Sequence, residues 1–529
     1  MKTRILAALF ILSATTASGR PDAGSPESSG TEKYRPKIHF SPVTGWMSDP
    51  NGMVYYDGEY HLCYQHIPFD DPAHIPWGEM YWGHAVSRDL LNWEPLPIAL
   101  APDSLGYIFS GSAVADRHNT SGLGTKENPP LLAVFTYYDH VAAKEGRAAE
   151  TQSQGLAYST DRGRTWTKYA GNPILESPGL VDFRDPKIIW YEEGKHWIMA
   201  VACGRVIRFY SSPDCIRWEY MSEFGEGFGS HIGPWECPDF FPMRVKGTDQ
   251  TRWVLLVSLY DSRDVPTKYH TATQYFIGDF DGKRFTTRQR DTLWVDYGRD
   301  NYAGVTFDNA PDSRRIFVGW MQSHQYAGGA MSIAGRSWAG AATFPRELSV
   351  VRDGESYRLV AEPAAEIGNL YGRQVRLPGM EIDGTVPLSD RIPFAKAPLD
   401  ISLSFGFPKH RPALYGIRLR NGAGEYFSIE YDFRAGCFRA DRTNATGTKF
   451  SEPFACVQQA PYRPDGKTME WRLLVDVASV ELFAGENKIV VTDVFYPSEP
   501  FDTIELYTDQ GKVKLKKGTI TELKTIRFE

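Results

Sequence analysis

AVSRDLLNW, at residues 85–93, is the first of four related segments that decide the fold class of this chain. In each segment a strand-like run leads into Ser-x-Asp or a close variant, and an aromatic residue follows a few positions later. The other three segments are AYSTDRGRTW (157–166), FYSSPDCIRW (209–218) and, more loosely, IGDFDGKRF (277–285). A strand and turn that recur at an irregular period of roughly 50 to 75 residues are typical of antiparallel propeller blades.

The rest of the chain fits this interpretation, because helical periodicity is nearly absent. Short alternating or wholly apolar runs, bounded by Gly, Pro, Asn and Asp, recur from end to end. This pattern predicts an all-β protein. Repeats of that period would fill residues 34–350 with about five blades, so we expect a five-bladed β-propeller there.

The sequence changes character after residues 346–348. Residues 351–385 are predicted to be a linker, and strict alternation then begins, as between Ile401 and Phe407. One buried face and one wet face are the pattern of a β-sandwich. We therefore expect a C-terminal β-sandwich over residues 386–529.

Length and composition limit the function classes. A chain of 529 residues exceeds one hydrophobic core of ordinary size, so two folded domains are expected. The net charge of -7 offers no basic surface for nucleic acid. The aromatic content of 13% suits both β-strands and flat apolar platforms for sugar rings.

The N-terminus has the order of a secretory signal peptide. Lys2 and Arg4 precede an apolar run at residues 5–12, and small residues follow, so residues 1–19 are predicted to be the signal. The apolar run is too short to span a bilayer, and we expect a secreted or periplasmic protein without a membrane span. Residues 20–33, rich in Pro, Gly, Ser and Glu, are predicted to be a disordered lead-in.

The six cysteines show neither a CxxC pair nor a His partner at zinc spacing, so no metal site and no cofactor are predicted. Large domains do not need disulfides, and most of the cysteines are expected to be small buried hydrophobes. A bridge between Cys437 and Cys456 stays open.

Three acidic residues stand in apolar, aromatic and proline-bearing surroundings rather than in solvated charge runs. They are Asp49 in WMSDPNG, Asp185 in DFRDPK and Glu236 in PWECPDFF. A proline follows Asp49 and Asp185 directly, which favours an extended backbone and predicts that the strand ends there. Any one such acid is more often structural, but the inner strands of a propeller converge, so acids from separate blades can meet.

Paired carboxylates are what glycoside hydrolysis needs, one ionised to attack the anomeric carbon and one protonated to donate to the leaving oxygen. Burial beside Trp235 and Cys237, with a second carboxylate nearby, favours the protonated form of Glu236 and suits it to the acid role. Asp49 has the backbone amides of the following turn available and would more easily remain ionised.

The stretch from His39 to Leu348 resembles glycoside hydrolase family 32, the β-fructofuranosidases that include invertases, inulinases and levanases. The motifs that carry the resemblance occur in family order. They are HFSPVTGWMSDPNG, YHLCYQ, YWGHAVSRDLLNWEPLPIAL, IFSGSAV, DFRDPK, WECPDFFP, QYFIGDFDG, DYGRDNYA and FPREL. SVELFAGE, further on, resembles the sandwich domain of the family.

The resemblance implies a propeller followed by a sandwich, and retaining hydrolysis through a covalent fructosyl-enzyme intermediate. Asp49 matches the nucleophile and Glu236 the acid/base catalyst. Asp185 matches the carboxylate that holds sugar hydroxyls and stabilises the transition state. Arg184, in the RDP motif, has a guanidinium that can orient a carboxylate or simply balance local charge.

Four further residues match positions that line the terminal fructose site, and Trp77 supplies an apolar wall there. They are Gln65, Trp77, Phe109 and Ser110. Two residues depart from the family pattern. Ser48 stands where Asn is usual, so a direct hydrogen bond to the sugar is expected to be lost or replaced by water. His324 stands where relatives often carry a second Trp, which makes the rim of the sugar site more polar.

The expected activity is therefore release of terminal β-D-fructofuranosyl units from levan, inulin or sucrose. Endo-acting cleavage and fructosyl transfer use the same residues and stay open, and loop shape rather than residue type decides between β-2,1 and β-2,6 linkages. Propeller glycosidases acting on arabinose or xylose also use two Asp and one Glu but lack WMSDPNG together with WECPDFF. A purely binding propeller is disfavoured because all three acids are present. The sequence indicates no oligomeric state.

Overall fold

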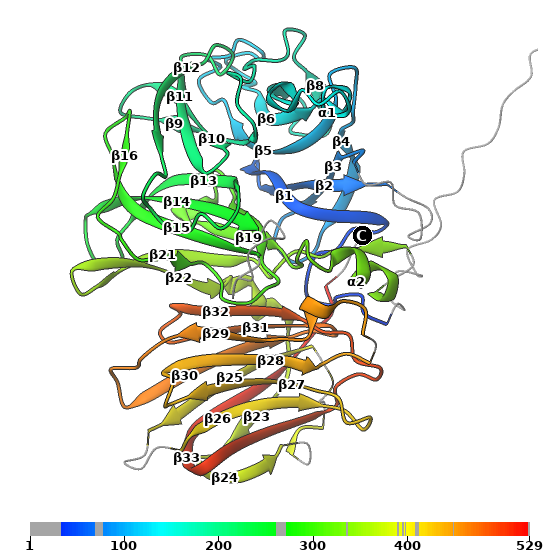
Figure 1. Ribbon diagram of the computed structural model, residues 1–529, viewed down its shortest axis with the longest axis vertical. Coiled ribbons are helices and arrows are strands. Elements are labelled where there is room, and N and C mark those ends of the chain that lie inside the picture. Colours follow the sequence, from blue (N-terminus) through cyan, green and yellow to red (C-terminus); the bar gives the residue numbers. More distant parts are fainter. Residues whose placement is uncertain are drawn as a thin grey trace, which may run out of the picture.

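The computed structural model describes residues 33–68, 78–260, 271–334, 337–388, 391–393, 396, 398–407, 412–447 and 449–526. The predicted signal peptide, the predicted lead-in up to residue 32, and Trp77 lie outside the described residues. The described chain is nearly all strand and forms a propeller packed against a sandwich (Figure 1). The predicted all-β fold is confirmed.

Five sheets make up the propeller, as predicted. The first has the order β20 (Trp338–Ala339), β1 (Gly45–Tyr56), β2 (Glu59–Ile67), β3 (Tyr81–Ser87) and β4 (Glu94–Leu100). The second consists of β5 (Tyr107–Ala115), β6 (Leu131–Tyr138), β7 (Gln152–Ser159) and β8 (Thr167–Lys168). The third consists of β9 (Phe183–Tyr191), β10 (His196–Cys203), β11 (Val206–Ser212) and β12 (Glu219–Phe224).

The last two blades follow the same plan. The fourth consists of β13 (Trp235–Arg244), β14 (Thr251–Tyr260), β15 (Thr271–Phe280) and β16 (Phe285–Thr286), with β17 (Leu293–Trp294) also beside β15. The fifth consists of β18 (Tyr302–Thr306), β19 (Ile316–Trp320), β21 (Arg346–Asp353) and β22 (Ser356–Pro363). Strand β20 pairs in parallel with the start of β1, so two distant segments of the chain meet in the first blade.

Helices play a small part in the described chain. The α-helices are α1 (His140–Lys144) and α2 (Ala327–Ala334). Single 3₁₀ segments occur at Ala148–Glu150, Pro311–Ser313, Ala365–Leu370 and Glu452–Phe454. No helix among the described residues is long and apolar enough to cross a lipid bilayer.

The four repeated sequence segments occupy the same turn in four blades, between the third and fourth strands. In each turn the Asp side chain accepts hydrogen bonds from backbone N–H groups that follow it. Asp89 Oδ1, for example, accepts from the N–H of Leu91 at 3.0 Å and of Asn92 at 2.8 Å. Asp161, Asp214 and Asp281 do the same. The repeat therefore encodes an Asp-capped turn that leads into the outermost strand of these four blades.

The C-terminal domain is a sandwich of two sheets joined by one long strand, β33 (Thr503–Leu523). Residues 503–509 of β33 pair with β26 (Leu414–Arg420), and residues 514–522 pair with β25 (Leu399–Gly406). Strands β27 (Tyr426–Asp432), β28 (Cys437–Asn444) and β29 (Val457–Pro461) extend the first sheet. Strands β30 (Thr468–Val475), β31 (Ser479–Ala484) and β32 (Ile489–Val494) extend the second.

The stretch 351–385 is not a linker, and that prediction is wrong. Strand β22 completes the fifth blade, whereas β23 (Tyr371–Leu377) and β24 (Met380–Pro387) pair with β33 in the sandwich. Six of the seven residues of β23 are exposed or half-buried. Such a polar, exposed strand lacks the alternation by which strands are recognised in a sequence.

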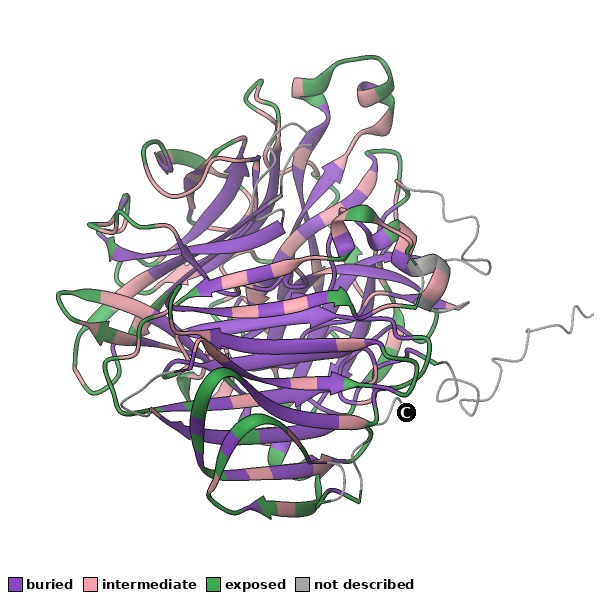
Figure 2. Ribbon diagram, turned by 60° about the horizontal axis from the view of Figure 1, so that its bottom comes forward, coloured by how far each residue is buried: buried purple, intermediate pink, exposed green. Residues whose placement is uncertain are grey.

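The two domains share an apolar interface. Leu474, Phe483 and Val490 of the sandwich belong to the same buried cluster as Leu348 and Leu359 of the propeller. Figure 2 shows buried residues running along the strands of both domains. All six cysteines are described. Five of them are buried, and Cys456 forms no disulfide, so the bridge left open above is absent.

Candidate active site

Each inner strand of the propeller carries a bulge in which two residues face one residue of the neighbouring strand. The bulged pairs are Ser48 and Asp49 in β1, Phe109 and Ser110 in β5, Asp185 and Pro186 in β9, Cys237 and Pro238 in β13, and Ala303 and Gly304 in β18. A bulge disrupts the ladder and re-aims side chains, and bulges are common beside active sites. The bulges of the first three blades thus contain predicted site residues, and Glu236 directly precedes the bulge of the fourth.

The prediction that strands end at the prolines after Asp49 and Asp185 is wrong. Strands β1 and β9 continue through both prolines. Proline lacks the N–H that a ladder needs, but a bulge leaves one residue unpaired and therefore tolerates it. The proline marks the position where the acid leaves the ladder rather than the end of the strand.

Asp49 is the acid of the first blade. Ser110 Oγ donates a hydrogen bond of 2.7 Å to its Oδ2, and Cys237 Sγ lies 3.7 Å from the same oxygen. The other oxygen, Oδ1, is buried without a hydrogen-bond partner among the described residues. Burial raises the pKa of Asp49, and the charge of Glu236 adds to the rise. The charge of His324 and the hydrogen bond from Ser110 oppose it.

Asp185 is the acid of the third blade and has a left-handed backbone, with φ of 61°. Its Oδ2 accepts a hydrogen bond of 3.0 Å from the N–H of Cys237, whose Sγ lies 3.6 Å away. Burial is the main cause that raises the pKa of Asp185 to about 7. The charge of Arg184, with its Nε 3.8 Å from Oδ2, opposes the rise. The Cys237 thiol therefore lies within 4 Å of oxygens from both aspartates.

Glu236, in the fourth blade, is held by two donors. Arg184 donates to its Oε1 at 2.7 Å, and the hydroxyl of Tyr302 donates to its Oε2. The second guanidinium arm of Arg184 bonds Asp182 at 2.5 Å. A tyrosine hydroxyl can both donate and accept, so Tyr302 can keep its hydrogen bond whether Glu236 is charged or protonated. Such a neighbour is compatible with a carboxyl group that alternates between these two forms.

The residues predicted to line the sugar site lie around these acids as far as they are described. Ser48 is buried beside Asp49 in the same bulge. Gln65, on β2, is buried and accepts a hydrogen bond of 3.3 Å from Asn51. Phe109 is half-buried and stacks on Tyr138, with ring centroids 4.6 Å apart. Trp77 lies outside the described residues.

Three residues at the site were not assigned a role from the sequence. Tyr302 contacts Glu236, Cys237 contacts both aspartates, and Asn51 links Gln65 to the N–H of Gly111. All three lie inside quoted motifs, so the signal was present in their clustering around the acids. Their partners, however, are 14 to 188 positions away in the chain, and the sequence alone does not pair them.

His324 packs against the aromatic side of the site. Its ring meets Tyr302 edge-on, with centroids 5.0 Å apart, and approaches Trp320 at 4.8 Å. The polar ring that was expected at the rim is therefore in contact with the residue that bonds Glu236.

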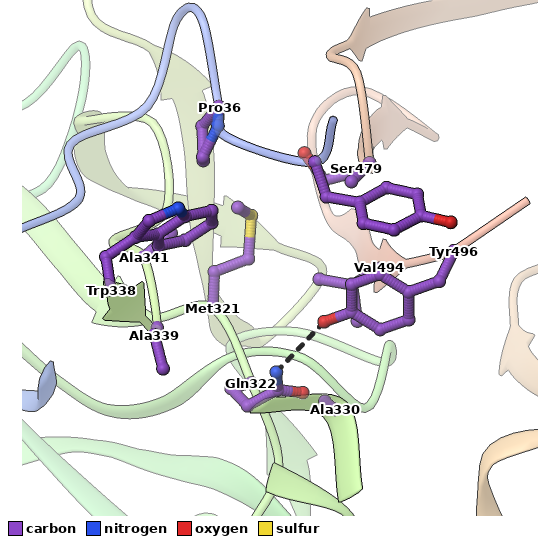
Figure 3. A pocket seen from close by; sticks show the side chains of 13 residues that line it. Pro36, Met321, Gln322, Ala330, Trp338, Ala339, Ala341, Ser479, Val494 and Tyr496 are labelled. Atoms are coloured by element: carbon purple, nitrogen blue, oxygen red, sulfur yellow. Dashed lines mark hydrogen bonds between the residues drawn. The ribbon is translucent and has the colours of Figure 1, made fainter. Parts of the chain in front are cut away.

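Two cavities lie near the central axis and the domain interface. One adjoins the acids and is lined by Asn51, Ser110, Asp185, Lys187 and Cys237 among others. The other lies between propeller and sandwich, bordered by Met321, Trp338 and Tyr496 (Figure 3). It contains no carboxylate in its lining, so it lacks the groups for acid-base chemistry. The described residues hold no group of three or more His, Cys, Asp or Glu side chains suited to a metal ion.

A five-bladed propeller whose inner strands bring together two aspartates and a glutamate, each with its own donors, has the paired carboxylates of a glycoside hydrolase. The comparisons with known proteins identify its family. The chain belongs to glycosyl hydrolases family 32, because the N-terminal domain model of that family matches residues 39–363 and its C-terminal model matches residues 366–522.

Relatives are similar over nearly the whole chain. A levanase from Bacillus subtilis (strain 168) is 40% identical over 534 residues, which cover 99% of this chain and 76% of the levanase. An extracellular exo-inulinase from Aspergillus awamori is 33% identical over 88% of this chain and 90% of its own. The crystal structure of exo-inulinase from Aspergillus awamori superposes with a TM-score of 0.83 at 30% identity, covering 94% of this chain and 99% of that one.

Proposed function

We propose that this glycosidase releases terminal β-D-fructofuranosyl units from levan or inulin, and from sucrose, with retention of configuration. The observation that carries the proposal is the set of three acids with different partners, two of them in inner-strand bulges and Glu236 directly before one. Asp49 accepts from Ser110, Asp185 from the Cys237 N–H, and Glu236 from Arg184 and Tyr302. The similarity to a levanase and to an exo-inulinase supports fructans as the substrate class.

Asp49 acts as the nucleophile in this proposal. A carboxylate oxygen of Asp49 attacks the anomeric carbon, and the bond from that carbon to the leaving oxygen breaks. Ser110 bonds Oδ2 of this carboxylate, so we assign the attack to the other oxygen, Oδ1. The product of this step is a fructosyl ester of Asp49.

Glu236 donates a proton to the leaving oxygen and afterwards removes one from the water that hydrolyses the ester. Asp185 would hold sugar hydroxyls and stabilise the positive charge that develops on the ring. The pKa of about 7 for Asp185 before substrate arrives reflects its burial and the neighbouring carboxylates. A ring with developing positive charge would favour the ionised form.

The remaining contacts to the terminal sugar are assigned to Gln65, Ser48, Phe109 and Ser110, with Trp77 as an apolar wall. Arg184 is assigned two roles, contact with the sugar and orientation of Glu236, because one arm of its guanidinium bonds that acid. The burial of Ser48, Gln65, Ser110 and Arg184 supports these roles, and Phe109 is half-buried. We further propose an exo mode, in which a funnel closes around one terminal sugar.

Export is the proposed location, outside the cell or in the periplasm. The order of charges and apolar residues at the N-terminus supports a cleaved signal over residues 1–19. The similarity to an extracellular exo-inulinase supports secretion.

Early product analysis tests this function. The enzyme would be incubated with inulin, levan and sucrose, and products separated by chromatography before a tenth of the substrate is consumed. Free fructose as the first product supports exo hydrolysis. The polymer that is hydrolysed faster, inulin or levan, gives the preferred linkage. Short oligosaccharides as first products would mean endo cleavage, and longer fructosylated sugars at high sucrose would mean transfer. No release from any of the three would overturn the proposal.

A further inference from the structure

The loop that precedes Tyr302 is held by the sandwich domain. It covers residues 295–301 between β17 and β18, and its backbone runs beside β32. The N–H of Tyr297 donates to Val490 O at 2.8 Å, and that of Asp300 donates to Thr492 O at 3.2 Å. At Gly298 an added Cβ would lie 2.0 Å from Thr492 O, so only glycine allows this approach.

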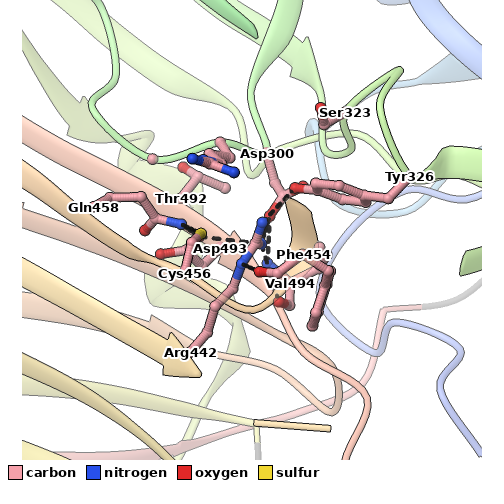
Figure 4. A network of polar contacts seen from close by, with 12 residues as sticks. Asp300, Ser323, Tyr326, Arg442, Phe454, Cys456, Gln458, Thr492, Asp493 and Val494 are labelled. Carbon is pink, nitrogen blue, oxygen red and sulfur yellow. Dashed lines mark hydrogen bonds and ion pairs between the residues drawn. The ribbon is translucent and has the colours of Figure 1, made fainter. Parts of the chain in front are cut away.

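Asp300 is the strongest point of this attachment. Its Oδ2 accepts from Arg442 at 2.5 Å and from the N–H of Val494 at 2.9 Å, and its Oδ1 accepts from the hydroxyl of Tyr326. Arg442 comes from β28 of the sandwich, and both charged side chains are completely buried. Figure 4 shows the guanidinium of Arg442 between Asp300 and Phe454.

Arg442 has further donors occupied as well. Its Nε donates to Phe454 O at 2.6 Å, and a terminal nitrogen donates to Tyr326 at 2.8 Å. A guanidinium with fixed partners on several sides cannot move without leaving buried groups unpaired. Asp300 belongs to the propeller and Arg442 to the sandwich. The sandwich therefore fixes the position of a propeller residue.

Tyr302 follows Asp300 by two residues and donates to Glu236. Its side chain is fully buried, so the position of its hydroxyl depends on where the backbone enters β18. The same network reaches the site a second way, because Tyr326 lies two residues after His324, which packs on the Tyr302 ring.

We propose that Arg442 of the sandwich is a positioning residue for catalysis, because its contact with Asp300 sets the loop from which Tyr302 donates to Glu236. The proposal rests on the proposed role of Glu236 as acid/base catalyst. The sandwich then contributes to proton donation at the active site although its own residues lie outside the acid cluster.

Arg442→Lys tests this inference, with kcat/KM measured for sucrose and for an aryl β-D-fructofuranoside whose leaving group needs no proton. If Arg442 acts through Glu236, kcat/KM should fall about tenfold or more for sucrose and less than about threefold for the aryl substrate. Only sucrose needs acid catalysis. Equal losses on both substrates, or no loss on either, would overturn the proposal.

Arg472→Lys is the matched control, because Arg472 pairs with Asp400 at 2.8 Å within the sandwich. It should leave the ratio of the two substrates unchanged, and all assays are run well below the unfolding temperature of each variant. If Arg442→Lys does not fold, Tyr326→Phe removes one hydroxyl that bonds both Arg442 and Asp300 but keeps the ring. It should show the same substrate dependence, and equal losses there would overturn the inference.

A double-mutant cycle separates positioning from general stability. Tyr302→Phe combined with Arg442→Lys should lose no more sucrose activity than Tyr302→Phe alone, because the first change already removes the group that Arg442 positions. Additive losses would contradict the proposal. Glu236→Gln measures the premise separately: if it shows no preference for the aryl substrate, the acid/base assignment fails rather than the role of Arg442.

Discussion

Ser110 Oγ donates a hydrogen bond of 2.7 Å to Asp49 Oδ2, which joins the bulge of the second blade to that of the first. The bond occupies one carboxyl oxygen and stabilises the ionised form, so it lowers the pKa of Asp49 against the burial that raises it. A nucleophile must be ionised to attack. In the proposed mechanism the neighbouring blade therefore helps to keep Asp49 ionised for attack.

Ser110→Ala should move the acidic limb of the pH profile of kcat/KM to higher pH. Without the hydrogen bond the pKa of Asp49 rises further, so the ionised fraction falls at any pH below the optimum. The loss at the optimum should be about tenfold or more, since one hydrogen bond to a buried carboxylate is removed. Ser159→Ala, in an outer turn of the same blade, should leave the limb in place. An unchanged limb in Ser110→Ala would show that the bond does not control Asp49.

Asp49→Asn and Glu236→Gln keep the shape of each side chain and remove the proposed nucleophile and the proposed proton donor. Each should lower kcat on sucrose by about 10³-fold or more without loss of folding. Glu223→Gln, on β12 of the third blade, is the control and should keep full activity. Circular dichroism and thermal unfolding verify the fold of each variant. A variant of Asp49 or Glu236 that retains more than a tenth of wild-type turnover would show that its assigned role is wrong.

The sequence predicted the propeller because each of four blades repeats an Asp-capped turn, a local feature that chain neighbours encode. It failed at β23 and β24, because exposed strands gain their pairing from β33 rather than from an alternating pattern. The three acids were recognisable from their motifs. Tyr302 and Arg442 were not given roles, since only the fold brings residues from distant segments to Glu236 and Asp300.

Activity should not depend on a metal ion. Attack and proton transfer are both assigned to carboxylates, which need no Lewis acid for this reaction. Turnover of sucrose should survive thorough EDTA treatment and dialysis into metal-free buffer. A loss of activity that added calcium restores would reveal a metal site, and a parallel thermal unfolding measurement would tell whether it serves stability alone.

His39 should make the stability of the protein depend on alkaline pH. Its ring is fully buried, with Nδ1 2.8 Å from Asp476 and Nε2 2.8 Å from Glu481. Burial alone would lower the pKa of His39, but the hydrogen bonds and charges of the two acids outweigh it and raise the pKa to about 9. A raised pKa gives stability that is complete below the unfolded value and lost as pH rises through the folded one.

The free energy of unfolding of the wild type should therefore fall between about pH 6.5 and pH 9, by roughly 3 kcal/mol if this group acts alone. Urea titrations at several pH values measure it. His39→Gln should be less stable at pH 6 and show a flatter response over that window. His118→Gln, an exposed control, should follow the wild type. A wild-type stability that stays constant from pH 6.5 to 9 would contradict the assignment.

The stereochemical course tests the mechanism itself. If Asp49 attacks the carbon directly, its carboxyl should lie about 5 to 5.5 Å from that of Glu236, whereas an intervening water would require about 6.5 to 9.5 Å.

Glu236→Ala should be rescued in part by azide when the substrate has a good leaving group, because azide resolves the fructosyl ester without a general base. The expected product is a β-fructosyl azide. Asp49→Ala should give no such product, since no intermediate would exist to capture. NMR identifies the anomer of fructose that is released first. If it is α-fructose, water displaces the leaving group in a single step and Asp49 is not the nucleophile.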